Sequence, residues 1–120
     1  MTEKTPDEAR RQIVSMVREF VRRDVVPVAQ EYEAADRYPS ELLEQMVGMG
    51  LFGITIPEEY GGMGLDYVTF ASIFEELSKG WMSLTGPLGT HHIVAYILGA
   101  YGTKEQKERF LPSMTRGERR

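Results

Sequence analysis

The chain has 120 residues, of which 42% are hydrophobic and 27% charged, with a formal charge of −4 and no cysteine. This size and composition are typical of one globular domain, and they exclude a disulfide framework, a thiolate metal site and a cysteine nucleophile. The acidic balance argues against a nucleic-acid partner. The chain has no signal peptide, and no apolar run approaches the roughly 20 residues that span a bilayer, which argues against membrane insertion. The expected location is therefore cytoplasmic.

A first helix is predicted to begin at Thr5, because Glu8 stands at the capping-box position and Pro6 suits the first helical turn. Pro27 removes one backbone donor and is expected to bend this helix, which continues as far as Tyr32. The arginines between its apolar positions are interpreted as a solvated face rather than a phosphate site: Arg10, Arg11, Arg18, Arg22 and Arg23.

A second helix is predicted from Pro39 to Gly48, with leucines and methionine on one face. Residues 51–57 are expected to form a packed loop. Alternation of Ile54 and Ile56 around Thr55 suggests a short extended piece within it. Glycines then allow backbone angles that other residues avoid: Gly61, Gly62 and Gly64.

A third helix is expected between its cap at Asp66 and Gly80, and a fourth from near Ser83. Residues 93–101 of the fourth helix are apolar on every side, which is typical of a helix surrounded by protein, yet 120 residues are too few to surround it. Thr103 and Gln106 form a second capping box, which starts a fifth helix. This helix is expected to end at Phe110–Pro112. Residues 116–120 carry no recognised signal that ends a helix. The prediction is a single all-α domain, residues 1–120.

Three patterns could indicate chemistry, and each has a plainer interpretation. Residues 48–53 spell G-x-G-x-x-G, but they follow a helix instead of a strand, so we interpret them as a helix end and not as a dinucleotide site. His91 and His92 project about 100° apart, which favours packed or hydrogen-bonded histidines over a metal site. The paired acids Glu58–Glu59 and Glu75–Glu76 are interpreted as surface carboxylates.

Residues 50–64, GLFGITIPEEYGGMG, resemble the glycine-rich loop between the second and third helices of acyl-CoA dehydrogenases. Residues 102–112, GTKEQKERFLP, are similar to the tight turn before the fifth helix of that family, and Pro39 stands at the matching start of the second helix. The resemblance extends from about Asp7 to Glu118. It implies the amino-terminal domain fold, an orthogonal-to-bundle arrangement of about five or six helices.

The resemblance also implies a function for a longer parent protein. Such enzymes remove the α-proton of an acyl-CoA while FAD accepts a hydride from the β-carbon, giving a trans-2-enoyl-CoA. A flavin-binding β-domain and a carboxy-terminal helical domain carrying the catalytic base are expected to be absent from this chain, which therefore contains no catalytic or metal-binding residue and no assignable cofactor-binding residue. The expected partners are acyl-CoA, an electron-transfer flavoprotein or similar acceptor, and further copies in a homotetramer.

By position, the start of the fourth helix is similar to the floor of the family's acyl-chain pocket. The candidate lining residues are Thr85, Gly86, Gly89, Thr90 and Ile93. The two glycines allow either a deep or wide pocket or the close approach of another helix. Two other functions remain open: a scaffold domain without chemistry, and the same domain of a flavin monooxygenase or acyl-CoA oxidase.

Overall fold

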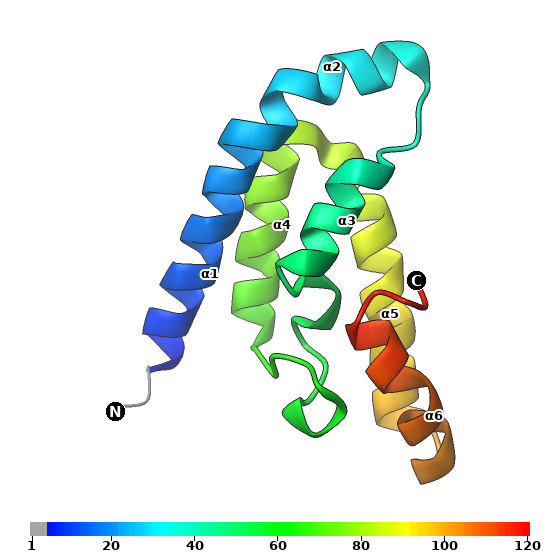
Figure 1. The fold of residues 1–120 in the computed structure, drawn as a ribbon. Coiled ribbons are helices and arrows are strands. Elements are labelled where there is room, and N and C mark those ends of the chain that lie inside the picture. The colour runs from blue at the N-terminus through cyan, green and yellow to red at the C-terminus, as the bar shows by residue number, and fades with distance from the viewer. Residues whose placement is uncertain (1–4) are drawn as a thin grey trace.

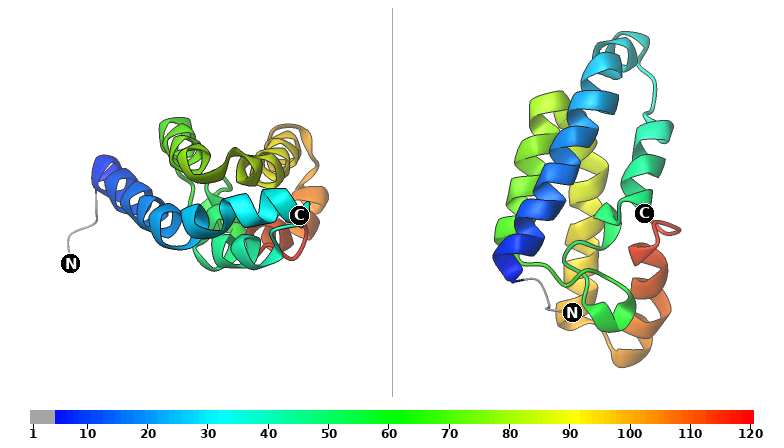
Figure 2. Two further views of the ribbon diagram at one scale, coloured as in Figure 1. Left: turned by 90° about the horizontal axis from the view of Figure 1, so that it is seen from above. Right: turned by 60° about the vertical axis from the view of Figure 1, so that its left-hand side comes forward.

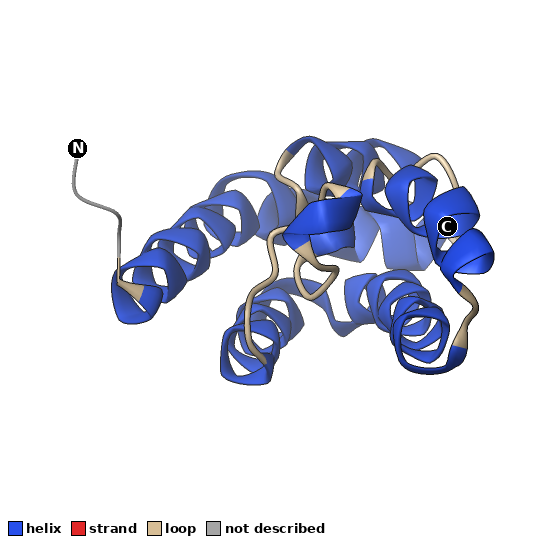
Figure 3. Ribbon diagram, turned by 90° about the horizontal axis from the view of Figure 1, so that it is seen from below, coloured by secondary structure: helices blue, strands red, loops and turns tan. Residues whose placement is uncertain are grey.

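The structure is a computed structural model that describes residues 5–120, a range that contains helices and turns but no strand (Figures 1 and 3). The α-helices of this range are α1 Pro6–Phe20, α2 Val26–Ala35, α3 Ser40–Gly48, α4 Tyr67–Trp81, α5 Thr85–Tyr101 and α6 Lys104–Thr115. Shorter turns are the π-helical η1 Val21–Val25 and the 3₁₀ turns η2 Leu51–Gly53, η3 Glu58–Tyr60 and η4 Met82–Leu84. The predicted all-α class is confirmed.

The predicted bend near Pro27 takes the form of the π-helical turn η1 between α1 and α2. The capping box at the start of α1 is present, with the Glu8 amide donating to Thr5 Oγ1 at 3.2 Å and the Thr5 amide donating to Glu8 Oε2 at 2.9 Å. After η1, α2 turns away from α1 and passes over the end of the bundle towards α3 (Figure 1). Gly80 lets α4 approach η1 closely, because a Cβ there would lie 2.5 Å from Val21 Cγ1.

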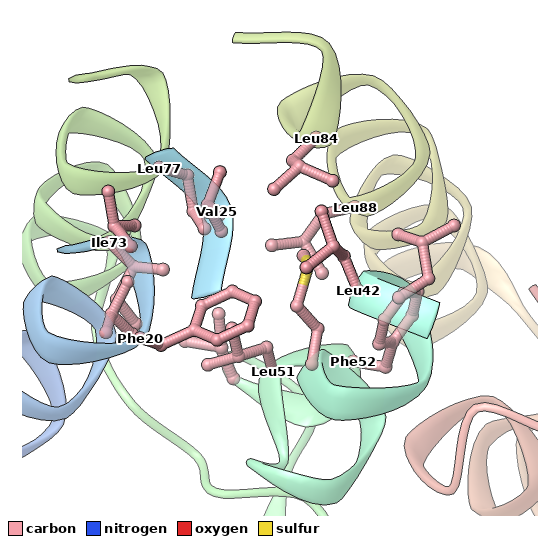
Figure 4. Close-up of a cluster of buried hydrophobic side chains, with 14 of the residues drawn as sticks. Phe20, Val25, Leu42, Leu51, Phe52, Ile73, Leu77, Leu84 and Leu88 are labelled. Carbon is pink, nitrogen blue, oxygen red and sulfur yellow. The ribbon is translucent and has the colours of Figure 1, made fainter. Parts of the chain in front are cut away.

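The core lies where α1, α3, α4 and α5 converge. Seen from above, α4 and α5 form one row, joined by η4, while α1, α2 and α3 lie on the opposite side (Figure 2). Phe20 and Leu77 reach inward from one side, and Leu88 and Phe52 from the other (Figure 4). A second buried cluster, consisting of Ile56, Ala95, Leu111 and Met114, joins the glycine-rich loop to α5 and α6.

The loop between α3 and α4 is packed as predicted, but the expected extended piece around Thr55 is absent. Ile54 and Ile56 are buried, yet this segment folds back on the residues that follow it. The Met63 amide donates to the Gly53 carbonyl at 2.8 Å, and the Leu65 amide donates to the Ile54 carbonyl at 2.8 Å. Alternating burial therefore arises here in an irregular loop whose backbone groups bond within the loop.

Two expectations about α6 were wrong. Pro112 does not end the helix. A proline lacks only its own backbone N–H donor, and the Arg116 amide still bonds to the Pro112 carbonyl at 3.3 Å. The tail does contain a stop signal, Gly117, whose φ of 72° suits glycine. Its amide bonds to the Met114 carbonyl at 3.0 Å, and the Glu118 amide bonds to the Ser113 carbonyl at 3.0 Å, as in a Schellman helix end.

The acidic pairs differ in their surroundings. Glu58, Glu59 and Glu75 are exposed, as expected. Glu76 was wrongly interpreted as a surface carboxylate: only 7% of its side chain is exposed, and Oε1 accepts a hydrogen bond of 2.9 Å from Arg18 Nη2. The reason is tertiary, because position 76 lies on the side of α4 that packs against α1.

Candidate functional site

Helix α5 is the element with the most uncovered apolar surface in the described part of the chain. Its inner side buries Leu88, His91, His92 and Ala95. Its outer side exposes at least half of five large side chains: Ile93, Val94, Tyr96, Ile97 and Tyr101. The expectation that this helix is incompletely covered is confirmed.

Groove 1 lies between α5, the first turn of α4 and the glycine-rich loop. It has a volume of about 450 Å³ and almost exclusively apolar walls. Its lining residues are Thr55, Tyr67, Phe70, Gly89, His92, Ile93 and Tyr96. This volume is within the range of about 300–1,000 Å³ that is usual for small-molecule sites.

Groove 2 lies on the other flank of α5, beside α6 and the end of the chain, and has a volume of about 530 Å³. Its lining residues are Thr90, His91, Val94, Ile97, Leu98, Phe110, Met114, Arg119 and Arg120. Groove 2 differs from groove 1 in having arginines at one end. The two grooves give α5 two separate apolar surfaces that a ligand could contact.

The structure divides the predicted pocket residues between these surfaces. Gly89 and Ile93 line groove 1, whereas Thr90 lines groove 2. Thr85 donates its hydroxyl to the Met82 carbonyl at 2.6 Å, and neither Thr85 nor Gly86 lines either groove. Helical spacing predicted that Gly86, Gly89, Thr90 and Ile93 share one face of the helix, and this was wrong for Thr90, which lines the other groove. The positions of α4 and α6 decide which groove each residue faces.

The two glycines in the first turns of α5, Gly86 and Gly89, have different surroundings. A Cβ at Gly89 would lie 3.4 Å from Cε1 of Phe74 on α4, which is an ordinary van der Waals contact. A Cβ at Gly86 would meet no atom within 4 Å. Close helix packing thus does not require glycine at either position, although Gly89 is the one that faces α4.

The two histidines bind the glycine-rich loop to α5. His91 Nε2 lies 2.8 Å from the Phe52 carbonyl oxygen, and His92 Nε2 lies 2.8 Å from the Leu51 carbonyl oxygen. A carbonyl only accepts, so each Nε2 carries the proton, and His92 Nδ1 accepts from Thr55 Oγ1 at 3.3 Å. Burial lowers the pKa of both imidazoles, that of His92 to about 4. The hydrogen-bonded interpretation of these histidines is confirmed.

Several groove-1 residues were missed from the sequence. His92 and Tyr96 could have been found, because they continue the helical spacing of Gly89 and Ile93. Thr55 and Tyr67 could not, since they belong to other elements. The only signal available for them was their place in the sequence, since Thr55 lies within the glycine-rich loop and Tyr67 follows it closely.

The described residues do not form a pyrophosphate cradle at the G-x-G-x-x-G pattern. Gly48 ends α3, and Gly50 has a φ of 80° that turns the chain. A Cβ at Gly53 would lie 2.9 Å from Thr115 Cγ2, so this glycine serves packing against α6. The helix-end interpretation is confirmed. Residues 5–120 also contain no cluster of three potential metal ligands and no helix long and apolar enough to cross a membrane.

Comparison with known proteins assigns the fold to a family. Residues 7–118 match the profile of "Acyl-CoA dehydrogenase, N-terminal domain". The chain belongs to the acyl-CoA dehydrogenase family. It is 29% identical to glutaryl-coenzyme A dehydrogenase in complex with glutaryl-CoA, with a TM-score of 0.86 over 98% of this chain and 31% of that one.

Relatives with different acyl-chain preferences are similarly close. The short-chain specific acyl-CoA dehydrogenase of Clostridium acetobutylicum is 37% identical over 87% of this chain. The long-chain specific mitochondrial enzyme of Rattus norvegicus is 40% identical over 85% of it. The matched part is 28% of the first relative and 24% of the second, so this acyl-CoA dehydrogenase domain corresponds to about a quarter of either enzyme.

Proposed function

We propose that this chain is the amino-terminal domain of an FAD-dependent acyl-CoA dehydrogenase and contributes walls to its acyl pocket. The reaction is α,β-dehydrogenation of an acyl-CoA thioester, with an electron-transfer flavoprotein or similar protein as acceptor. The parent is proposed to be a cytoplasmic homotetramer in which a β-domain and a second helical domain follow residues 1–120. Family membership supports the reaction class, and the longer relatives support the additional domains.

The single observation that carries the proposed role is the exposed apolar side of α5. Ile93 is 59% exposed and Ile97 52% exposed on a helix that also borders two grooves. Apolar surface of this extent is uncommon on a monomer and marks a site that another group covers. An acyl tail and the remainder of the parent protein are the proposed covering groups.

Flavin chemistry is assigned to parts outside this chain. Gly50 and Gly53 pack against their own domain, and no carboxylate of the described residues lies in groove 1. The residues of α5 are proposed to bind the tail and keep water from it. Thr85, Gly86, Gly89, Thr90 and Ile93 remain the proposed tail contacts, with Tyr96 and Phe70 added from groove 1.

The test of the pocket is Gly89→Leu in the longer protein read from the same gene. A leucine at position 89 enters groove 1, so kcat/KM for long acyl-CoA substrates should fall by about tenfold or more relative to short ones. Gly48→Ala is the matched control, because a Cβ there meets no atom within 4 Å and lies far from α5 in the chain. An unchanged chain-length profile for Gly89→Leu would reject the pocket assignment.

The 120-residue chain alone is expected to have no dehydrogenase activity and weak or no flavin binding. Dialysis against FAD followed by an absorbance spectrum measures this directly. A retained one-to-one flavin ratio would refute the expectation. In the longer protein, absence of acyl-CoA-dependent flavin bleaching would favour a scaffold, whereas hydrogen peroxide release without an acceptor protein would favour an oxidase.

A further inference from the structure

Groove 1 has a wall without charged side chains in the part of the chain that the structure describes. None of its lining residues is Asp, Glu, Lys or Arg. Tyr67 and Tyr96 contribute neutral hydroxyls, and both side chains are more than half exposed. His92 is the lining residue whose charge changes near neutral pH unless its surroundings prevent it. The groups that bind this imidazole therefore decide how polar the groove is.

Both ring nitrogens of His92 are occupied by groups of the glycine-rich loop. Nε2 donates to the Leu51 carbonyl at 2.8 Å, and Nδ1 accepts from the Thr55 hydroxyl at 3.3 Å. His92 is 4% exposed, and its ring packs edge-on against Phe70 with 5.1 Å between the ring centres. Burial lowers the pKa of His92 to about 4, so the imidazole is neutral at pH 7. Because Thr55 and His92 both line groove 1, their hydrogen bond lies in its wall.

We propose that Thr55 is a specificity-determining residue that makes groove 1 reject acyl tails with a polar or charged end. Because the Thr55 hydroxyl occupies Nδ1 of His92, the wall offers no ring nitrogen to an entering polar group. A hydroxyl or carboxylate at the end of a tail would lose its hydration there without gaining this partner, which disfavours binding, whereas a hydrocarbon end loses no such bonds. The inference rests on the proposed role of groove 1 as acyl pocket and adds the class of tail, an unsubstituted hydrocarbon.

The test compares substrates that differ only at the far end of the tail, with the longer protein read from the same gene as the enzyme. The saturated acyl-CoA of six to ten carbons with the highest kcat/KM is measured beside its ω-hydroxy and ω-carboxy derivatives of equal length. The unsubstituted substrate should be preferred over the ω-hydroxy derivative by about 100-fold, and over the ω-carboxy derivative by more. Equal kcat/KM values would overturn this inference and leave the proposed dehydrogenase function intact. No turnover of any acyl-CoA would reject that function, and the inference with it.

Two variants at position 55 separate the hydroxyl from the shape of the side chain. Valine has a similar shape to threonine but no hydroxyl, so in Thr55→Val the Nδ1 atom of His92 is free to accept from an ω-hydroxyl. The preference for the unsubstituted over the ω-hydroxy substrate should then fall by about tenfold. Thr55→Ser keeps the donor and should retain the wild-type preference. The readout is a ratio of kcat/KM values in one protein, so a partly folded sample does not change it.

Thr115→Val is the matched control, because Thr115 packs against the same loop but lines neither groove. A Cβ at Gly53 would lie 2.9 Å from Thr115 Cγ2, and the buried Thr115 hydroxyl has no hydrogen-bond partner within residues 5–120. This variant should keep the wild-type preference. An unchanged preference in Thr55→Val, or an equal loss of preference in Thr55→Ser or Thr115→Val, would overturn the role assigned to the Thr55 hydroxyl.

Discussion

Glu76 is a carboxylate held by two cations between α4 and α1. Arg18 donates to its Oε1 through Nη2 at 2.9 Å and Nε at 3.2 Å, and Lys79 Nζ lies 3.3 Å from the same atom. These hydrogen bonds, foremost that of Arg18, hold the pKa of Glu76 below its usual value. A depressed pKa means that ionised Glu76 stabilises the folded state more than the unfolded one.

Replacement of Glu76 by glutamine should therefore lower the free energy of unfolding at pH 7 by about 1–3 kcal/mol. The contribution of Glu76 is complete above its unfolded pKa of about 4.3 and is lost as the pH falls through its lower folded value. Urea denaturation at pH 7 and pH 3 measures the difference in the free energy of unfolding between the wild-type chain and the Glu76→Gln variant. This difference should be smaller at pH 3. A difference that stays constant across this range would contradict the ionised pairing. Glu75→Gln, on an exposed neighbour, is the control.

The glycine-rich loop is the element whose position depends most on distant partners. His91 and His92 donate to consecutive carbonyls of η2, and Thr55 donates to His92, across 37 to 41 residues of chain. The same histidines face opposite grooves, His92 in groove 1 and His91 in groove 2. The loop and α5 therefore form one unit that sets the shape of both apolar surfaces.

This arrangement predicts a loss of stability in mild acid. Because the pKa of His92 is lowered from 6.5 to about 4, only the unfolded chain takes up a proton between these values. The free energy of unfolding should be highest above pH 6.5 and should fall towards pH 4, by at most about 1.4 kcal/mol per pH unit for this group. His92→Gln keeps an amide donor for the Leu51 carbonyl and should reduce that slope in urea denaturation. An unchanged slope would show that His92 does not control it.

For the whole molecule, the uncovered side of α5 has a consequence beyond any ligand. Tyr101 is 80% exposed, and Ile93 and Ile97 are both more than half exposed on the same helix. Helix α5 contains no Asp, Glu, Lys or Arg. Contiguous apolar surface of this kind drives association in water.

The 120-residue chain should accordingly self-associate as its concentration rises. Sedimentation velocity should show a larger species at high concentration, and an Ile93→Lys, Ile97→Lys variant should shift the chain towards monomer because it places charge on the contact surface. Val26→Lys is a matched control, since Val26 is 56% exposed but lies on α2. A wild-type chain that remains monomeric at high concentration would refute this prediction.

Features that depend on neighbouring residues were determined by the sequence alone. The predicted capping boxes at Thr5 and Thr103 and the predicted helix cap at Asp66 are confirmed. Each joins groups that are only three residues apart in the sequence. The apolar character of residues 93–101 likewise predicted an uncovered helix, and two ordered motifs at residues 50–64 and 102–112 identified the family.

Only the tertiary structure decided the surroundings of single residues. The burial of Glu76 depends on Arg18, 58 positions away, and the bond between Thr55 and His92 spans 37 positions. Neither the paired acids nor the paired histidines indicate such partners, because sequence periodicity describes the faces of one helix at a time. Gly89 and Thr90 face different grooves for the same reason: α4 packs on one flank of α5 and α6 on the other.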